Sequence, residues 1–152
     1  MKTARDVLKA IKDDDIKYVD CRFTDPRGKW QHVTFDVTMI EEETFSEMHV
    51  LASDEIFHFY LGDPVEMLLL YPSGQSLLLT LGPDLAAGQR PQILVPAGVW
   101  QGTRLVEGGK LALLGCTVTP GFDYADYESG RYAELAAKWP AEAERIRKLA
   151  RM

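Results

Sequence analysis

The chain has 152 residues, of which 46% are hydrophobic, and its formal net charge is −6 at pH 7. A chain of this length can form a single hydrophobic core but is too short for a large multidomain enzyme. The acidic balance argues against a sequence-independent hold on nucleic acid, which needs clustered Lys and Arg. No stretch approaches the roughly twenty apolar residues of a membrane span, and the charged first ten residues lack the apolar run of a signal peptide. We therefore expect a soluble, cytoplasmic protein that contacts neither nucleic acid nor membrane.

The N-terminal part shows a helical pattern followed by two strand patterns. Apolar residues at helical spacing predict a short amphipathic helix over Lys2–Asp13. Two segments of alternating polarity, Ile16–Phe23 and Trp30–Phe35, predict strands. The connection Asp25–Gly28 supplies a proline to start a turn and a glycine to end it. We therefore expect a helix followed by a β-hairpin.

The segment from Thr3 to Phe45, with VLKAIKDDDIKYVDCRFTDPRGKWQHVTFDVTMI at its centre, resembles the start of bacterial glutamine synthetase. In that family the segment opens the N-terminal β-grasp domain, and the nucleotide, metal and glutamate sites lie in a large C-terminal region. The resemblance therefore implies a fusion or chimera without glutamine synthetase activity, joined between about Val37 and Ser46. We assign residues 1–43 to this segment.

The remainder of the chain has a β pattern that gives way to helices. From Met48 onward, short apolar or alternating runs are separated by turns rich in Gly and Pro, which indicates a β-sandwich or barrel. After Gly121 the pattern predicts helices over Tyr132–Lys138 and Ala141–Arg151, with Pro140 suited to the first turn of the second. The expected strands are 55–61, 65–70, 76–81, 92–95, 98–105 and 110–118.

Two motifs in this region repeat a known spacing. His49, Glu55 and Gly62 form the first, and Pro96–Gly98 followed by Gln101 forms the second. With the blocks SDEIFHFYLGDP, GPDLAAGQRPQ, VPAGVWQG and GCTVTPGFDYADYE in this order, the chain resembles the cupin superfamily, and most closely a subfamily of small cupins of largely unassigned function. The resemblance implies a mainly β, jelly-roll barrel over about 44–130, a C-terminal helical segment over 131–152 that packs on the barrel, and a homodimer.

The resemblance also locates the positions that hold a metal ion in metal-binding cupins. There the ligands are three histidines and one glutamate, which here become His49, Leu51, Glu55 and Gln101. Leucine cannot ligate a metal and a neutral amide is a poor donor. We therefore assign no definite cofactor, and a divalent metal held by His49, Glu55 and Gln101 stays an open alternative. His58 is a reserve ligand only if a bulge turns it toward Glu55.

Metal-free members of the superfamily imply an acid–base site instead, in which a histidine and a tyrosine epimerise nucleotide sugars. His49 or His58 could act as the base, because imidazole titrates near neutral pH. Tyr60, Tyr124 and Tyr127 are the candidate acids. The equally open alternative is that these side chains are hydrogen-bonded wall residues. As catalytic candidates we name His49, His58, Glu55 and Tyr124.

A small-molecule pocket combines apolar surface with a few polar groups that fix orientation. Trp100 could supply apolar surface at the barrel mouth, and Arg104 could pair with Glu55 or hold an anionic ligand. The ligand-binding candidates are Gln101, Trp100, Arg104 and Tyr60.

Two further features are expected to be structural. Cys21 and Cys116 are far apart, belong to no CxxC pair and lie in strand-like runs, so we interpret them as reduced core thiols. The segment Gly121–Glu128 contains three carboxylates that could bind a hard cation, but we favour a role in closing the chain after the last strand.

These observations predict a cupin that binds a small polar molecule inside its barrel, with isomerase-like catalysis as the enzymatic form of that hypothesis. The competing class is a non-catalytic binding or assembly protein with a vestigial pocket.

Overall fold

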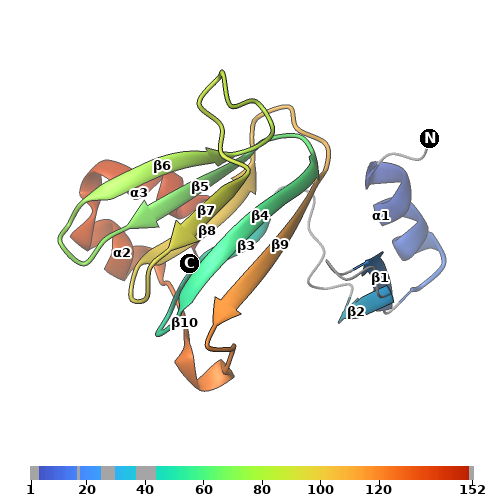
Figure 1. Cartoon of the computed structure of the whole chain (residues 1–152), viewed down its shortest axis with the longest axis horizontal. Helices are drawn as coiled ribbons and strands as arrows, with labels where there is room; N and C mark the ends of the chain where they lie inside the picture. Colours follow the sequence, from blue (N-terminus) through green and yellow to red (C-terminus); the bar gives the residue numbers. More distant parts are fainter. Residues whose placement is uncertain (1–3, 17, 25–29, 37–43, 151–152) are drawn as a thin grey trace. The chain divides into compact units, whose positions relative to one another are not determined.

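The computed structural model describes residues 4–16, 18–24, 30–36 and 44–150, and the chain divides into two compact units, Met1–Glu42 and Glu43–Met152. The first unit contains helix α1, Ala4–Asp13, and strands β1, Tyr18–Thr24, and β2, Trp30–Asp36 (Figure 1). The two strands form an antiparallel pair, as the alternating pattern predicts. The expected turn at Asp25–Gly28, and most of the expected join, lie outside the described residues.

The second unit is built from two antiparallel sheets, which confirms the predicted mainly β barrel (Figure 1). One sheet has the strand order β10-β3-β8-β5-β6 and the other β7-β4-β9. Within the described part of the chain, no helix is both long enough and apolar enough to cross a membrane. The strands are β3 Thr44–Leu51, β4 Asp54–Gly62, β5 Val65–Leu70, β6 Ser76–Leu81, β7 Gln92–Val95, β8 Trp100–Leu105, β9 Ala112–Thr119 and β10 Tyr127–Ser129.

The pattern of alternating residues did not predict two of these strands. β3 pairs with β8 through two register shifts, between Thr44 and Ser46 and between Ser46 and His49, so its apolar residues do not follow a period of two. β10 has only three residues, and it pairs with the other side of β3. Just before it, the Asp123 side chain accepts a hydrogen bond from the Ala125 amide and caps the 3-10 helix η2, Tyr124–Asp126. The acidic segment therefore covers the edge of β3, as expected for a closing role.

Alternation along the strands divides the apolar residues between two cores. On β5, Met67 and Leu69 point into the barrel, whereas Leu68 and Leu70 point to the outside of the sheet. The barrel interior is therefore an apolar core, in which a buried polar side chain needs a hydrogen-bond partner. The buried residues of this inner core are Phe57, Val65, Met67, Leu69, Leu81, Ile93, Val95, Val99, Leu105 and Ala112.

The C-terminal helices cover the outer face of the five-stranded sheet. Helix α2, Tyr132–Lys138, is followed by the 3-10 helix η3, Pro140–Glu142, and by α3, Ala143–Arg147. The second predicted helix starts two residues later than expected, because the turn that begins with Pro140 is 3-10 rather than α, and it ends earlier, at Arg147. The buried residues of the outer core are Met48, Leu68, Leu70, Leu135, Trp139, Ile146 and Leu149.

A glycine at the end of β4 is required by the close approach of another segment. Gly62 has φ of 103°, and a Cβ atom there would lie 2.2 Å from the carbonyl oxygen of Leu111. Next to it, the Asp63 carboxylate accepts hydrogen bonds from the amides of Lys110 at 2.7 Å and Leu111 at 3.2 Å. These two backbone hydrogen bonds, led by that of Lys110, lower the pKa of Asp63. The turn after β4 is therefore fastened to the loop that leads into β9.

Candidate functional site

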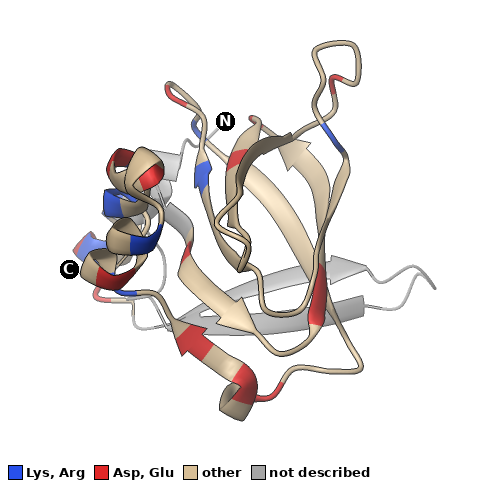
Figure 2. Ribbon diagram, turned by 90° about the vertical axis from the view of Figure 1, so that its left-hand side faces the viewer, with Lys and Arg blue, Asp and Glu red and all other residues tan. Residues whose placement is uncertain are grey.

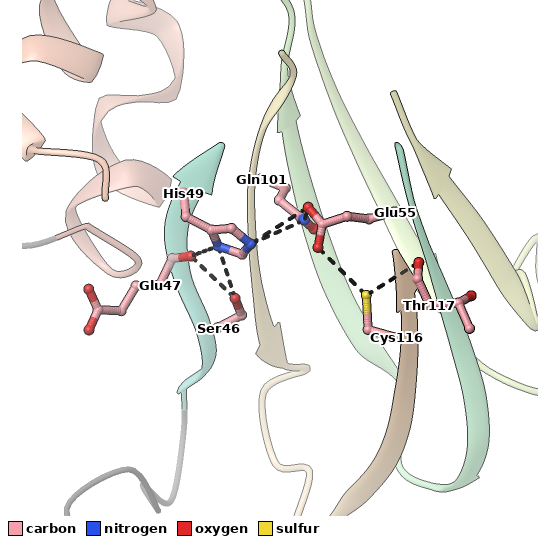
Figure 3. Close-up of polar contacts among 7 residues, drawn as sticks. All are labelled: Ser46, Glu47, His49, Glu55, Gln101, Cys116 and Thr117. Atoms are coloured by element: carbon pink, nitrogen blue, oxygen red, sulfur yellow. Dashed lines mark hydrogen bonds and ion pairs between the residues drawn. The ribbon is translucent and has the colours of Figure 1, made fainter. Parts of the chain in front are cut away.

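Three of the predicted site residues meet inside the barrel, from three different strands (Figure 3). His49 on β3, Glu55 on β4 and Gln101 on β8 are 6%, 5% and 0% exposed. The Gln101 amide nitrogen lies 3.2 Å from His49 Nε2 and donates a hydrogen bond to Glu55 Oε1. His49 Nε2 and Glu55 Oε1 are themselves 3.8 Å apart. The Gln101 amide therefore bridges the imidazole and the carboxylate.

The backbone of β3 fixes the tautomer of His49. His49 Nδ1 lies 2.7 Å from the carbonyl oxygen of Glu47, and since a carbonyl can only accept, Nδ1 carries the proton. Ser46 Oγ lies 3.2 Å from the same nitrogen. In the neutral imidazole Nε2 is then the acceptor, and it faces the Gln101 amide nitrogen (Figure 3). Tyr127 on β10 stacks on the imidazole, with ring centroids 5.1 Å apart and an interplanar angle of 20°.

The second oxygen of Glu55 is contacted by a thiol from β9. Cys116 Sγ donates to Glu55 Oε2 at 3.6 Å (Figure 3). Burial of the sulfur raises the pKa of Cys116 to about 12, and the negative charge of Glu55 and its hydrogen bond add to that rise. Cys116 lies directly opposite Phe57 of the inner core, so its side chain is on the inner face, yet the residue reaches solvent. Cys116 therefore lies where the inner face of β9 meets solvent.

Two buried oxygens on β8 have no hydrogen-bond partner among the described residues. They are Gln101 Oε1 and Thr103 Oγ1. Gln101, Thr103 and Leu105 share the inner face of β8, because they alternate along the strand and Leu105 belongs to the inner core. Thr103 is 0% exposed, so bulk water does not reach its hydroxyl. Buried polar atoms are paired in the great majority of cases, which makes two such oxygens on one strand face unusual.

The donor set at this site does not suit a tightly bound divalent metal. The group between His49 and Glu55 is the amide nitrogen of Gln101, which donates hydrogen bonds and is not a ligand. Leu51, at the position of a histidine ligand, is a buried apolar residue. Cys116 is a protonated thiol. Among the described residues, no three His, Cys, Asp or Glu side chains are grouped to hold a metal ion. His49, Glu55 and Gln101 do come together as predicted, but as a hydrogen-bonded network.

His58 and Tyr60 do not belong to this site. His58 lies on the outer face of β4, where Nε2 is 2.8 Å from Thr117 Oγ1 and Nδ1 is 3.0 Å from the Gln92 amide nitrogen. The register shift that could have turned it inward occurs later, between Phe59 and Leu61. Tyr60 is 61% exposed and stacks with His58 at 6.4 Å. The proposed catalytic role of His58 and the proposed ligand contact of Tyr60 therefore have no geometric support inside the barrel.

Three further candidates also lie away from the barrel interior. Trp100 and Arg104 alternate with Gln101 and Thr103, so they point to the outside of β8. There Trp100 packs against the outer core, and Arg104 lines a cleft next to α3. Tyr124 is 84% exposed and contacts Phe122 edge to face, with centroids 5.0 Å apart. Trp100 and Arg104 were chosen by residue type without counting which face of the strand each occupies, whereas Tyr124 lies in η2, to which strand alternation does not apply.

Sequence reasoning missed Thr103 and the contact between Cys116 and Glu55. Thr103 follows Gln101 by two residues, so the alternation of β8 was a sufficient signal for its inward position. The pairing of β9 with β4 that brings Cys116 to Glu55 joins residues 61 positions apart, and no local pattern encodes it.

Two facing antiparallel sheets with a polar cluster between them define a small β-barrel whose interior presents polar groups. A sequence model for the cupin superfamily, described as Cupin superfamily (DUF985), matches residues 4–130, so the chain belongs to this family. The resemblance and the fold expected from the sequence are thereby confirmed.

Solved structures agree with this assignment over nearly the whole chain. A crystal structure of a protein from Shewanella oneidensis is 28% identical, with 99% of each chain covered and a TM-score of 0.68. A hypothetical protein from Leishmania major is 20% identical, with 99% of this chain and 100% of that chain covered and a TM-score of 0.65. The second similarity is one of fold alone.

The N-terminal segment is similar to glutamine synthetases over a short span. The enzyme from Bradyrhizobium diazoefficiens is 79% identical over 47 residues, which are 31% of this chain and 10% of the enzyme. The enzyme from Azorhizobium caulinodans is 53% identical over 70 residues, which are 46% of this chain and 15% of the enzyme. The chain therefore spans only a small part of the length of the curated relatives that it matches.

Proposed function

We propose that this cupin binds a small, neutral molecule rich in hydroxyl or N–H groups inside its barrel. The observation that carries the proposal is the pair of buried oxygens without partners, Gln101 Oε1 and Thr103 Oγ1. Each such group costs about 1–3 kcal/mol when it is left unpaired. A ligand that donates hydrogen bonds to these oxygens would offset that cost.

The chemistry of the neighbouring groups narrows the ligand class. Gln101 Oε1, the unprotonated His49 Nε2 and the Glu55 carboxylate are all hydrogen-bond acceptors. An anion would meet the Glu55 carboxylate in a poorly hydrated site, which is unfavourable. A polyol or sugar-like molecule supplies donors without negative charge, so it is the ligand class that we favour. Solvent access next to Cys116 supports exchange of the ligand with bulk solution.

Isomerase-like proton transfer is the second candidate, and the tautomer of His49 favours it. A neutral imidazole whose Nδ1–H donates to the Glu47 carbonyl oxygen can accept a proton at Nε2 from a bound molecule. Tyr127 meets His49 through its ring face rather than as a hydrogen-bonded acid. We therefore assign the base role to His49 and leave Tyr127 as a stacking partner.

Native mass spectrometry with elemental analysis of the purified chain tests the binding proposal, because it reports bound organic molecules and metal from one sample. We expect a retained neutral polar molecule that is lost in Thr103→Val, a change that removes only the hydroxyl. The matched control is Thr117→Val, which makes the same change on the outer face and should retain the molecule. Equal occupancy in both variants, or a wild-type chain without any ligand across a panel of polyols, would favour the non-catalytic assembly protein.

Deuterium uptake tests the isomerase-like candidate separately. The retained molecule is incubated with the chain in D2O and its mass is measured afterwards. Proton transfer to and from carbon incorporates deuterium, and His49→Gln should abolish this incorporation while binding is measured in parallel. Binding without any incorporation would contradict catalysis but not the binding proposal. We also expect no γ-glutamyl transfer in a glutamine synthetase assay, because the similarity covers only 10% and 15% of two such enzymes.

A further inference from the structure

A cleft lies on the outside of the barrel, next to helix α3. It has a volume of about 240 Å³ and is bounded by β5, β6, β8 and the C-terminal helical segment. The residues that line it come from the sheet, from the loop after β8 and from the helical side: Glu66, Leu68, Leu78, Arg104, Glu107, Arg145, Lys148 and Leu149. Figure 2 shows that residues of both charges alternate along the helices next to the C-terminus. The cleft belongs entirely to the second unit and is separate from the barrel interior.

The charges in this cleft are not paired with one another. Arg104 lies directly opposite Glu66 in the pairing of β8 with β5, and both are half-buried. Within the described part of the chain, neither side chain forms a hydrogen bond or ion pair. Arg145 is engaged by Glu142 at 2.7 Å, whereas Lys148 has no such partner in the same part of the chain. The cleft therefore offers two cations, Arg104 and Lys148, and two carboxylates, Glu66 and Glu107, that are not paired within the described part of the chain.

We propose that this cleft binds a free α-amino acid with an apolar side chain. The ligand carboxylate would be held by Arg104 and Lys148, because guanidinium and ammonium groups make strong hydrogen bonds to carboxylates. Glu66 would accept from the ligand ammonium group. Leu78, which is 42% exposed, provides the surface for the apolar side chain. A ligand that carries only a carboxylate would leave Glu66 unpaired. A ligand that carries only an ammonium group would leave Arg104 and Lys148 unpaired.

The size of the cleft agrees with this class of ligand. Pockets for drug-sized molecules measure roughly 300–1,000 Å³. A cleft of about 240 Å³ is smaller than that and suits a single amino acid rather than a nucleotide or a disaccharide. Its lining also differs from the acceptor-rich barrel site, so the two sites would select different molecules.

Isothermal titration of the full chain with three matched probes tests the proposal. L-Leucine carries both charges, 4-methylpentanoate lacks the ammonium group, and 3-methylbutylamine lacks the carboxylate. We expect leucine to bind at least about tenfold more tightly than either analogue, since each analogue lacks one of the two charged groups that would make ionic hydrogen bonds in the cleft. Absence of leucine binding at millimolar concentration, or equal affinity for leucine and 4-methylpentanoate, would overturn the assignment.

Neighbouring residues on the same helical segment provide the matched variants. Lys148→Gln removes a cation that lines the cleft, and we expect the affinity for leucine to fall about tenfold or more. Arg147→Gln removes a cation that is paired with Glu144 outside the cleft, and it should leave the affinity unchanged. Glu66→Gln should reduce the preference for leucine over 4-methylpentanoate. If Lys148→Gln and Arg147→Gln bind leucine equally well, the ligand does not occupy this cleft.

Discussion

The buried hydroxyl of Thr103 is expected to reduce the stability of the chain when no ligand is bound. Its hydroxyl is fully buried, and no described group pairs with it. Thr103→Val should therefore raise the free energy of unfolding of the ligand-free chain by about 1 kcal/mol, because it removes an unpaired polar group without changing the volume. Urea denaturation of the wild type and of the variant measures this difference. A loss of stability would mean that the hydroxyl is paired and would remove the main support for a ligand at this position.

Cys116 provides a second prediction at the scale of one residue. Burial and the Glu55 carboxylate raise the pKa of the thiol to about 12, so the reactive thiolate is scarce at neutral pH. Alkylation by iodoacetamide should remain slow up to about pH 10 and accelerate only above it, although the residue reaches solvent.

Glu55→Gln tests how far the Glu55 carboxylate raises the pKa of the Cys116 thiol. It removes the negative charge but keeps a hydrogen-bonding group, so the pKa of Cys116 should fall toward the ordinary value while burial still holds it above that value. The pH profile of alkylation, followed by mass spectrometry at the Cys116 peptide, measures the shift. An unchanged profile would show that Glu55 does not act on the sulfur.

Residue spacing identified the centre of the site but not its surroundings. His49, Glu55 and Gln101 were found because their separations in two motifs persist even where the metal ligands do not. Arg104 and Trp100 were chosen by residue type, although strand alternation places both on the outer face. His58 was expected to face inward only with a bulge, and the register shift of β4 comes after it. The bridging role of the Gln101 amide depends on interatomic distances that no sequence pattern contains.

At the scale of elements, Gly62 fixes the end of β4. Gly62→Ala combines an unfavourable positive φ with a clash against the Leu111 carbonyl oxygen, and we expect a loss of more than about 2 kcal/mol in the free energy of unfolding. Gly74→Ala is the control, since Gly74 has φ of 90° but open space around its Cβ position, so that only the conformational cost of about 1–2 kcal/mol applies. Thermal and chemical denaturation of both variants tests the difference. Equal losses would mean that the Leu111 segment yields to the new methyl group.

The local pattern of apolar and polar residues predicted most elements that have one buried face and one exposed face. β5 and β8 are within two residues of their expected bounds, because long apolar or alternating runs end at glycine and proline turns. β3 and β10 were not predicted, because bulges disrupt the alternation of the first and the second is stabilised by its pairing with β3. Such strands depend on tertiary partners, which is information that lies outside their own sequence.

The hairpin of the first unit yields another prediction for an element. β1 and β2 pair from Tyr18 opposite Asp36 to Thr24 opposite Trp30, so their facing amides should be protected in hydrogen exchange. Mass spectrometry of peptides from 18–24 and 30–36 measures this protection, with the exposed segment 121–124, whose amides have no hydrogen-bond partner in the described part of the chain, as the fast-exchanging reference. Rapid exchange throughout both strands would contradict a stable hairpin in the glutamine-synthetase-like segment.

At the scale of the whole molecule, the cupin resemblance implies a homodimer. The exposed side chains of Leu94, Leu113 and Tyr60 on the outer face of the three-stranded sheet support an association surface there. We expect native mass spectrometry to detect a dimer, and Leu94→Asp together with Leu113→Asp to shift it to monomer. A wild-type monomer at tens of micromolar concentration would contradict this expectation.

Strand β8 is the common wall of both proposed sites, since Gln101 faces the barrel interior while Trp100 and Arg104 face outward. Trp100, which precedes Gln101 on β8, can serve as an intrinsic fluorescence probe of the barrel site. A molecule that displaces the Gln101 amide would alter the backbone to which Trp100 is attached, and hence the polarity around its ring. The emission of Trp100, measured with Trp30 and Trp139 replaced by phenylalanine, would then report ligand binding inside the barrel, although Trp100 itself lies on the outer face.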